Sequence, residues 1–501
     1  MNLSRTSRRE FLRAVACAAC SGGAAALLPQ LRMMGSALAG TPLSGYKAMV
    51  CIYLAGGNDS WNLIVPHDAA RFDVYATARN GVFSGSNSGG LALANPADGD
   101  PQIVVDNADS NPATNQYFLH PSLVSMADMY RANQLAFAVN TGTLVRPIDM
   151  SGYSTSSNRP PQLYSHADQE NLWHQASTNA KSVLGWGGLC ADNLQSQGAN
   201  GTPIGSGPQL SLCISIAGAN RFEIGNVVNN PYQLSSSGLK TLSGVCNPTC
   251  TGNSHVRDTA LNDMLADAYA SDFAQEYSST FGRGRELFAM LDPNLGAGDY
   301  ALATTFPDTS LGNQLEVVAE MIKLSQALNY ASRQIYYVRL GGFDLHSGLM
   351  STNTNSTTDH AGLLTQVDQA VAAFWTEMMS QGRQDDVVAF TASEFARTLQ
   401  SNGSGSDHGW GGVQWMLGGA VAGGRLYGDG NNGVGISGFP NQAYGDESNP
   451  NPNAFSRGQF IPGIGVEQYA ATIAQWLGVS TANLNTIFPN LPNFGGPLSF
   501  L

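Results

Sequence analysis

Positive charge is scarce in this sequence. Only four of its 501 residues are lysines, charged residues of both signs make up 12% of the chain, and the formal net charge is −13. A protein that binds a phosphate polymer needs a basic surface, so we expect no nucleic-acid partner. No run of eighteen apolar residues occurs beyond the N-terminal segment, so we expect no membrane span in the mature chain. With 43% hydrophobic residues, the chain can bury a large core, which excludes wholesale disorder.

The N-terminal segment is typical of an export signal. Arg8 and Arg9 precede an apolar run over residues 14–28, and small residues follow at Ala37 and Ala39. This order resembles a twin-arginine signal, which directs folded proteins to the periplasm or out of the cell. We expect cleavage near Ala39, which leaves 19 basic and 36 acidic residues and a formal charge of about −17.

Five cysteines follow that segment. Cys246 and Cys250 lie in C-N-P-T-C within a polar loop, where an oxidising compartment favours a short-loop disulfide. The odd count means that at least one of Cys51, Cys190 and Cys213 stays free, and Cys51, inside an apolar run, is our choice.

The remaining chain alternates helical patterns with short apolar runs that are typical of buried strands. We expect strands within residues 47–59, 135–140, 335–340 and 386–392, and helices near 123–131, 315–330, 361–381 and 466–477. This order predicts an α/β fold with a mostly parallel central sheet and helices on both faces. We expect residues 40–501 to form a single domain with long loops at 83–114, 195–207, 235–254, 351–358 and 428–458.

Polar clusters follow several of these strands, where ligands bind in open α/β sheets. In G-G-N-D-S-W-N, Asp59 is a candidate metal ligand or base, with a helix cap or Asx-turn as the alternative. In G-G-F-D-L-H-S, Asp344 and His346 supply the oxygen and nitrogen donors that zinc prefers, together with His360 in the Asp359-His360 pair. A hydrogen-bonded surface histidine is the alternative there.

A third cluster combines T-A-S-E-F-A-R-T with D-H-G-W-G-G. Asp407 and His408 present two donors from one turn, and Glu394 is a candidate ligand for a second ion. Arg397 is a candidate for binding an oxyanion. The alternative is an ion pair between Glu394 and Arg397.

The fourth cluster is Y-S-H-A-D-Q-E-N-L-W-H. A metal ion can lower the pKa of a serine hydroxyl enough to make Ser165 a nucleophile. The competing interpretation makes Ser165 a helix N-cap, with Asp168 completing the turn. His166 is a candidate metal ligand or orienting donor.

Taken in order, G-G-N-D, S-H-A-D-Q, G-G-F-D-L-H, S-E-F-A-R-T and D-H-G resemble the exported domain-of-unknown-function family 1501, grouped with the alkaline phosphatase and sulfatase superfamily. The resemblance extends from Lys47 to Leu491. It implies a metal-ligand role for Asp59, for Asp407 with His408, and for Asp344 with His346 or His360. It also places Ser165 at the nucleophile position. The chain departs from the superfamily pattern because no histidine follows His408.

Two functions follow as hypotheses. The first is an exported hydrolase of phosphate or sulfate esters, on small molecules or glycans, that uses one or two divalent ions. Zinc is the preferred ion, and calcium, magnesium and manganese are alternatives. The second is a non-catalytic protein that binds glycans or a co-exported partner, for which exposed tryptophans would provide stacking surfaces. The candidates for such stacking are Trp61, Trp173, Trp186 and Trp410.

Overall fold

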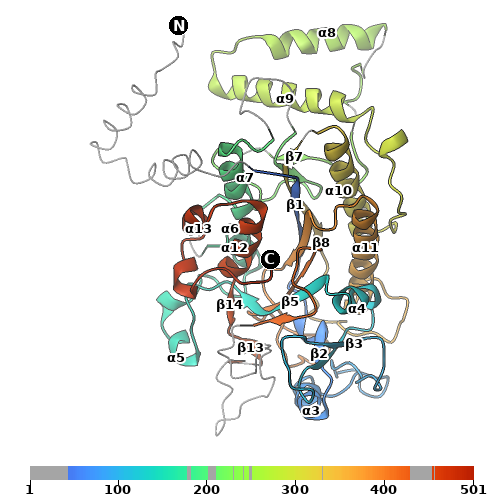
Figure 1. Ribbon diagram of the computed structural model, residues 1–501, viewed down its shortest axis with the longest axis vertical. Helices are drawn as coiled ribbons and strands as arrows, with labels where there is room; N and C mark the ends of the chain where they lie inside the picture. The colour runs from blue at the N-terminus through green and yellow to red at the C-terminus, as the bar shows by residue number, and fades with distance from the viewer. Residues whose placement is uncertain are drawn as a thin grey trace, which may run out of the picture.

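The computed structural model describes residues 43–177, 182–200, 210–228, 231–240, 242–246, 251–329, 331–428, 454–455 and 457–501. The expected export signal, Cys250 and most of the expected loop 428–458 lie outside these residues. Figure 1 shows a central sheet between two groups of helices.

The strands are β1 (Lys47–Leu54), β2 (Ile64–Pro66), β3 (Ile103–Val105), β4 (Gln116–Leu119), β5 (Leu135–Gly142), β6 (Cys213–Ser215), β7 (Tyr232–Gln233), β8 (Arg333–Leu340), β9 (Val387–Ala392), β10 (Gly412–Leu417), β11 (Leu426–Tyr427), β12 (Ala454–Phe455), β13 (Gln459–Phe460) and β14 (Ile464–Gly465). The α-helices are α3 (Ala69–Ala78), α4 (Val124–Arg131), α5 (Met150–Tyr153), α6 (His166–Gln175), α7 (Trp186–Ser196), α8 (Asn253–Ala266), α9 (Asp272–Leu291), α10 (Ser310–Ala327), α11 (His360–Ser380), α12 (Val466–Leu477) and α13 (Thr481–Ile487). Short 3-10 helices are η2 (Ser60–Asn62), η3 (Ser156–Asn158), η4 (Gly298–Tyr300) and η5 (Leu491–Phe494).

The central sheet has the strand order β11-β5-β10-β9-β1-β8-β6-β7, and β14 also pairs with β5. Strand β10 is antiparallel to both β9 and β5, whereas the other pairings in this sheet are parallel. The predicted α/β fold with a mostly parallel sheet is therefore confirmed. The reversed direction of β10 is not predictable from its sequence, because a short apolar run looks the same in parallel and antiparallel pairing.

Strand β1 is apolar along its length because both faces of the sheet are covered. Val50 and Ile52 lie in the core shared with α4, α10 and α11. Met49 and Cys51 point the other way, into the core shared with α7, α12 and α13. Figure 1 shows these two helix groups on opposite sides of β1 and β8. The period-2 alternation of side chains thus divides one strand between two cores.

Two smaller units lie at opposite ends of the molecule. The sheet β2-β4-β3 and helix α3 form one end, close to where β1 finishes, and the paired helices α8 and α9 form the other (Figure 1). Among the described residues, no helix is long and apolar enough to cross a membrane.

The cysteines partly follow the prediction. Cys51, Cys190 and Cys213 are all free and buried, so the choice of Cys51 was right but incomplete. Cys246 forms a disulfide, and its expected partner Cys250 lies outside the described residues.

Candidate metal centre

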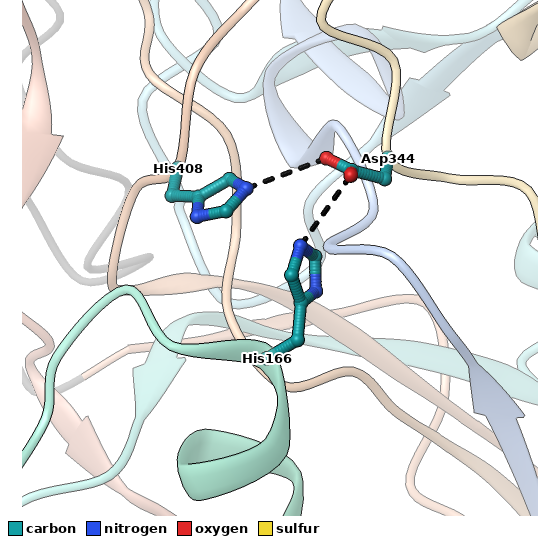
Figure 2. A group of neighbouring side chains, drawn as sticks. All are labelled: His166, Asp344 and His408. Atoms are coloured by element: carbon teal, nitrogen blue, oxygen red, sulfur yellow. Dashed lines mark hydrogen bonds and ion pairs between the residues drawn. The ribbon is translucent and has the colours of Figure 1, made fainter.

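Three side chains from distant parts of the chain form the candidate metal centre. Asp344 follows β8, His166 is the first residue of α6, and His408 lies in the segment that connects β9 to β10. Each offers one ligand atom, and these atoms lie within 4.8 Å of one another. Figure 2 shows both imidazole rings directing a nitrogen toward the Asp344 carboxylate. The Nε2 atoms of His166 and His408 are each 3.4 Å from one of its oxygens.

His346 extends this group. Its Nε2 lies 3.1 Å from Asp344 Oδ1 and 3.0 Å from the Nε2 of His408. The side chain of His346 is 47% exposed and that of Asp344 is 45% exposed, so the centre is open to solvent. A third imidazole therefore adjoins the group of His166, Asp344 and His408 at an accessible point.

Each of the three histidines is anchored through its other ring nitrogen. The Nδ1 atom of His166 is 2.8 Å from Glu394 Oε1, and that of His346 is 3.1 Å from Asp407 Oδ1. The Nδ1 atom of His408 donates to the carbonyl oxygen of Tyr164 at 2.7 Å. The anchors are carboxylate and carbonyl oxygens, which accept hydrogen bonds, so each Nδ1 carries a proton. In the neutral ring, each Nε2 then presents a lone pair to the centre.

The contact between His346 Nε2 and His408 Nε2 has a chemical consequence. Two nitrogen lone pairs repel each other at 3.0 Å, so this geometry requires either a second proton on one ring or a cation between them. The anchoring of each ring through Nδ1, with Nε2 directed inward, is the arrangement that fixes metal-binding histidines.

Arg397 neutralises Asp344. It is fully buried, and its Nη1 donates to Asp344 Oδ1 at 2.6 Å and to the carbonyl oxygen of Gly56 at 3.2 Å, while Nη2 donates to the carbonyl oxygen of Ser406. Partial burial raises the pKa of Asp344, but the hydrogen bond and charge of Arg397 outweigh it and hold the pKa below its usual value. Arg397 therefore keeps Asp344 ionised, and its contacts differ from both sequence-based interpretations, the oxyanion site and the pair with Glu394.

Asp407 is held in the same way. It pairs with Arg457, accepts a hydrogen bond from Asn402 Nδ2 at 3.1 Å, and contacts His346. Burial raises the pKa of Asp407, but Asn402, His346 and Arg457 together lower it below its usual value. The predicted ligands Asp407 and Glu394 thus contact the Nδ1 atoms of His346 and His166, whereas the Nε2 atoms of these rings face the centre.

The histidines differ in their readiness to bind a cation. The hydrogen bond to Glu394 raises the pKa of His166. Burial lowers the pKa of His408, despite the opposing hydrogen bond to Tyr164. His408 is thus neutral at neutral pH, whereas a cation must compete with a proton for His166.

Glycine at position 56 lets two of these loops meet. Its backbone has a φ of +121°, and a Cβ there would lie 2.3 Å from the backbone nitrogen of Asp344. The amide of Gly56 donates to Glu394 Oε1 at 2.8 Å. The G-G-N-D sequence after β1 therefore positions the Asp344 and Glu394 loops.

Asp59, which follows these glycines, lies apart from the centre. Its side chain is 1% exposed, it forms an ion pair with Arg79, the C-cap residue of α3, and it accepts a hydrogen bond from the backbone amide of Trp61 at 3.1 Å. Arg79 is itself fully buried. The expectation that Asp59 converges with the other candidates is not met, because its oxygens are used by Arg79 and by the cap of η2.

His360 also lies apart. It is the first residue of α11, it is fully buried, and its Nε2 lies 3.0 Å from Asn58 Oδ1. Its ring meets that of His120 edge to face, with centroids 5.5 Å apart. Burial lowers the pKa of His360 to about 4, so the ring is neutral. Of the two alternatives, His346 lies beside Asp344 and His408, whereas His360 contacts Asn58.

Ser165 caps helix α6. Its Oγ donates to Asp168 Oδ2 at 2.6 Å and accepts from the Asp168 amide at 3.4 Å. These are the contacts of the capping alternative. The preceding residue, Tyr164, has a φ of +73°, which is rare outside glycine, and its carbonyl accepts from His408.

Two contributors to the site, the Tyr164 carbonyl and Arg457, carry no signal in the sequence, whereas His166 does. His166 was considered a ligand or orienting donor, and the structure brings it to the centre. Tyr164 acts through its backbone carbonyl, which no side-chain pattern reveals. Arg457 comes from a Gly/Asn/Pro-rich stretch that reads as an ordinary surface loop. The four tryptophans expected to be exposed are 0–3% exposed, which removes the basis for glycan stacking on them: Trp61, Trp173, Trp186 and Trp410.

Comparison with known proteins gives one family match. The model of the family described as a protein of unknown function (DUF1501) matches residues 318–435. The matched segment contains Asp344, His346, Glu394, Asp407 and His408, but not His166. It supports the resemblance to this family, while the wider placement among alkaline phosphatases and sulfatases stays a prediction.

No curated protein matches the chain. Among solved structures, the chain is similar to the crystal structure of Ps i-CgsB in complex with k-i-k-neocarrahexaose, with 9% identity and a TM-score of 0.31. The alignment covers 91% of this chain and 78% of that one. A likeness of this degree is too low to assign a fold family or a ligand.

Proposed function

We propose that this chain is an exported metal-dependent hydrolase of phosphate or sulfate esters. The ion would be held by the Nε2 atoms of His166, His346 and His408 and by the carboxylate of Asp344. The observation that supports this most directly is the 3.0 Å approach of the His346 and His408 Nε2 atoms, because both rings are anchored by Nδ1 and present lone pairs. The ester class comes from the family resemblance.

The donor set favours zinc over magnesium or calcium. Imidazole nitrogens suit zinc and other late transition metals, whereas magnesium and calcium prefer an all-oxygen shell. Glu394 and Asp407, the other carboxylates near the centre, instead anchor His166 and His346. The proposal is therefore for a single ion of the zinc type.

Local charge links substrate binding to the ion. Three carboxylates at the centre, Asp344, Glu394 and Asp407, face two guanidinium groups, Arg397 and Arg457. With neutral histidines the group has a net charge of −1, and a divalent ion reverses it to +1. Since the mature chain has a formal charge of about −17, an anionic ester depends on the ion for local attraction.

The bound ion supplies Lewis acidity and lowers the pKa of water. The chain's own residues keep the centre ready for it: Arg397 holds Asp344 ionised, and the Nδ1 anchors aim the histidines inward. Because Ser165 is engaged with Asp168, the nucleophile in this proposal is water rather than the serine hydroxyl.

Metal content and hydrolysis together test the proposal. The wild-type chain, purified after metal loading, should hold about one zinc per molecule and cleave some aryl phosphate or sulfate esters. Asp344→Asn removes one ligand charge and should lose both the ion and the activity. Asp128→Asn, in an exposed pair with Arg131 on α4, is the control and should keep both.

Two results would contradict the proposal. A folded wild-type chain that binds no transition metal would exclude the centre. A zinc-loaded chain that cleaves no ester faster than Asp344→Asn would leave a metal-binding protein without this activity, which would favour the non-catalytic alternative of glycan or partner binding.

A further inference from the structure

Helices α8 and α9 expose an unusual amount of apolar surface. None of the residues of α8 is buried against the described part of the chain, and α9 buries only Ser278, Leu287 and Leu291. Phe273 is 91% exposed and Tyr277 is 72% exposed. Val256 and Met264 on α8 are 65% and 59% exposed. Large aromatic side chains gathered at this exposure are typical of an interaction surface.

Six residues along one face of α9, apolar at both ends with Thr and Gly between them, follow a heptad pattern. Alternating spacings of four and three residues relate them in the order Phe273, Tyr277, Thr280, Gly284, Leu287 and Leu291. This is the spacing of the a and d positions in a coiled coil. Leu287 and Leu291 at the C-terminal end pack into the main core. The same stripe continues past the core to Phe273 and Tyr277, where nothing in the described residues covers it.

The charged residues beside this stripe indicate which partner it binds. Glu276 and Arg283 lie one residue before Tyr277 and Gly284, at the two g positions of the heptads. In an antiparallel pair of identical helices, g positions face g positions, so Glu276 of one copy meets Arg283 of the other, twice by symmetry. A parallel pair would place these charges opposite Phe281 and Phe288 instead. Arg283 has no ion-pair partner among the described residues.

The same register matches large residues with small ones. It places Phe273 opposite Gly284 of the second copy and Tyr277 opposite Thr280. A Cβ built on Gly284 meets nothing within 4 Å among the described residues, so an aromatic ring has room to approach. Glycine within a helix costs roughly 1 kcal/mol relative to alanine, and close helix packing compensates for such a cost.

We propose that α9 is a homodimerisation helix, which pairs antiparallel with α9 of a second copy through Phe273, Tyr277 and the Glu276–Arg283 contacts. Helix α8 supports it from behind: Arg285 Nη2 of α9 donates to Asp258 Oδ1 of α8 at 2.5 Å, and Ser278 Oγ donates to the Leu265 carbonyl at 3.0 Å. Because only a short stretch of α9 forms the interface, we expect a dimer that dissociates at low concentration.

An anionic membrane surface fits less well. Residues 253–292 contain seven acidic residues against three arginines, so these helices would be repelled by anionic lipid. Binding of the chain to phosphatidylglycerol vesicles, in place of self-association, would overturn the proposal.

Sedimentation velocity over a range of micromolar concentrations, with the whole chain, is the test. The wild-type chain should shift from monomer to dimer, and Phe273→Glu should stay monomeric. Val227→Glu, at a position 61% exposed outside these helices, is the control for adding an acidic residue and should dimerise normally.

Exchanging the charges at positions 276 and 283 distinguishes this antiparallel register from non-specific hydrophobic association. Glu276→Arg and Arg283→Glu should each weaken the dimer about tenfold, since two attractive contacts become repulsive, and the double variant should restore it. A wild-type chain that stays monomeric throughout, or a double variant as weak as the singles, would refute the model. Zinc content should be the same in all these variants, so this outcome is independent of the proposed metal centre.

Discussion

Two Asp/His clusters near the ends of neighbouring strands show how differently the same residue types are used. Asp344 and His346 are 45% and 47% exposed and face two further imidazoles. Asp59 and His360 are 1% and 0% exposed, and each already has a protein partner, Arg79 or Asn58. Ligand capacity therefore depends on which lone pairs the fold leaves free, and residue type alone does not determine it.

The difference originates in what packs over each cluster. Helix α3 brings its C-cap residue Arg79 to Asp59, and Asn62 Oδ1 and the Leu399 carbonyl accept further hydrogen bonds from Nη2 and Nη1 of the guanidinium. At the exposed cluster, Arg397 is buried, whereas its partner Asp344 remains 45% exposed. The buried cluster thus contributes stability, and the exposed one is available for binding.

Removing Asp59 should produce the largest effect on folding. Asp59→Ala leaves Arg79 buried without its counter-charge, so the free energy of unfolding should fall by about 3–5 kcal/mol in urea denaturation. The control Asp128→Ala breaks a pair exposed at both ends and should cost less than about 1 kcal/mol. If Asp59→Ala lost zinc without losing stability, Asp59 would belong to the metal centre after all.

The second-largest effect should be a loss of stability in acid, caused by His360 of the buried cluster. Because burial lowers the pKa of His360 from 6.5 to about 4, unfolded chains take up a proton on this residue that the folded chain refuses. Its stabilising contribution is complete above pH 6.5 and is lost as the pH falls through 4. His120 packs against the ring, Asn58 contacts Nε2, and the charges of Asp59, Arg79 and Asp359 act on it.

His360→Gln keeps a nitrogen near Nε2 but does not titrate. Between the two pKa values, the slope of unfolding free energy against pH should decrease by about 1.4 kcal/mol per pH unit. The measurement is denaturation in chelator, which removes any linkage to metal. The exposed His255→Gln should leave the slope unchanged, and an unchanged slope in His360→Gln would mean that the ring is protonated in the folded chain.

The outer anchors should give the smallest effect, confined to the exposed cluster. Glu394→Gln and Asp407→Asn each keep the shape of the anchor but weaken the acceptor for a histidine Nδ1–H. Zinc affinity, measured by competition with a chelator, should fall roughly 10–100-fold in each. A complete loss of the ion, equal to that of Asp344→Asn, would instead make these carboxylates direct ligands.

Much of the fold was predictable because it depends on local periodicity. Helix α12 was expected at 466–477 and occurs as Val466–Leu477, and strands β1, β5, β8 and β9 lie where apolar runs indicated them. The pairing direction of β10 depends on a partner far along the chain, which periodicity does not encode. Helices α8 and α9 were also not identified.

The candidate centre was predictable in its residue types but not in its division of roles. Asp344, His346 and His408 were identified from Asp/His motifs that follow strands. The contacts of Asp59 could not be predicted, because its partner, Arg79, carries no recognisable motif. Glu394 and Asp407 contact the Nδ1 atoms of histidines. Which ring nitrogen a carboxylate contacts depends on the folded structure and cannot be read from the sequence.

Strand β10 runs against its neighbours, and this has a consequence for how the centre can change. If the strand after β9 were parallel to it, the chain would have to cross back to the opposite end of the sheet. Because β10 is antiparallel, the chain enters it at the same end of the sheet at which β9 finishes. Residues 393–411 therefore carry one inward histidine, two outer carboxylates and the guanidinium that neutralises Asp344. Exchange of this single loop between homologous chains would therefore replace all of these groups at once and leave the central sheet unchanged.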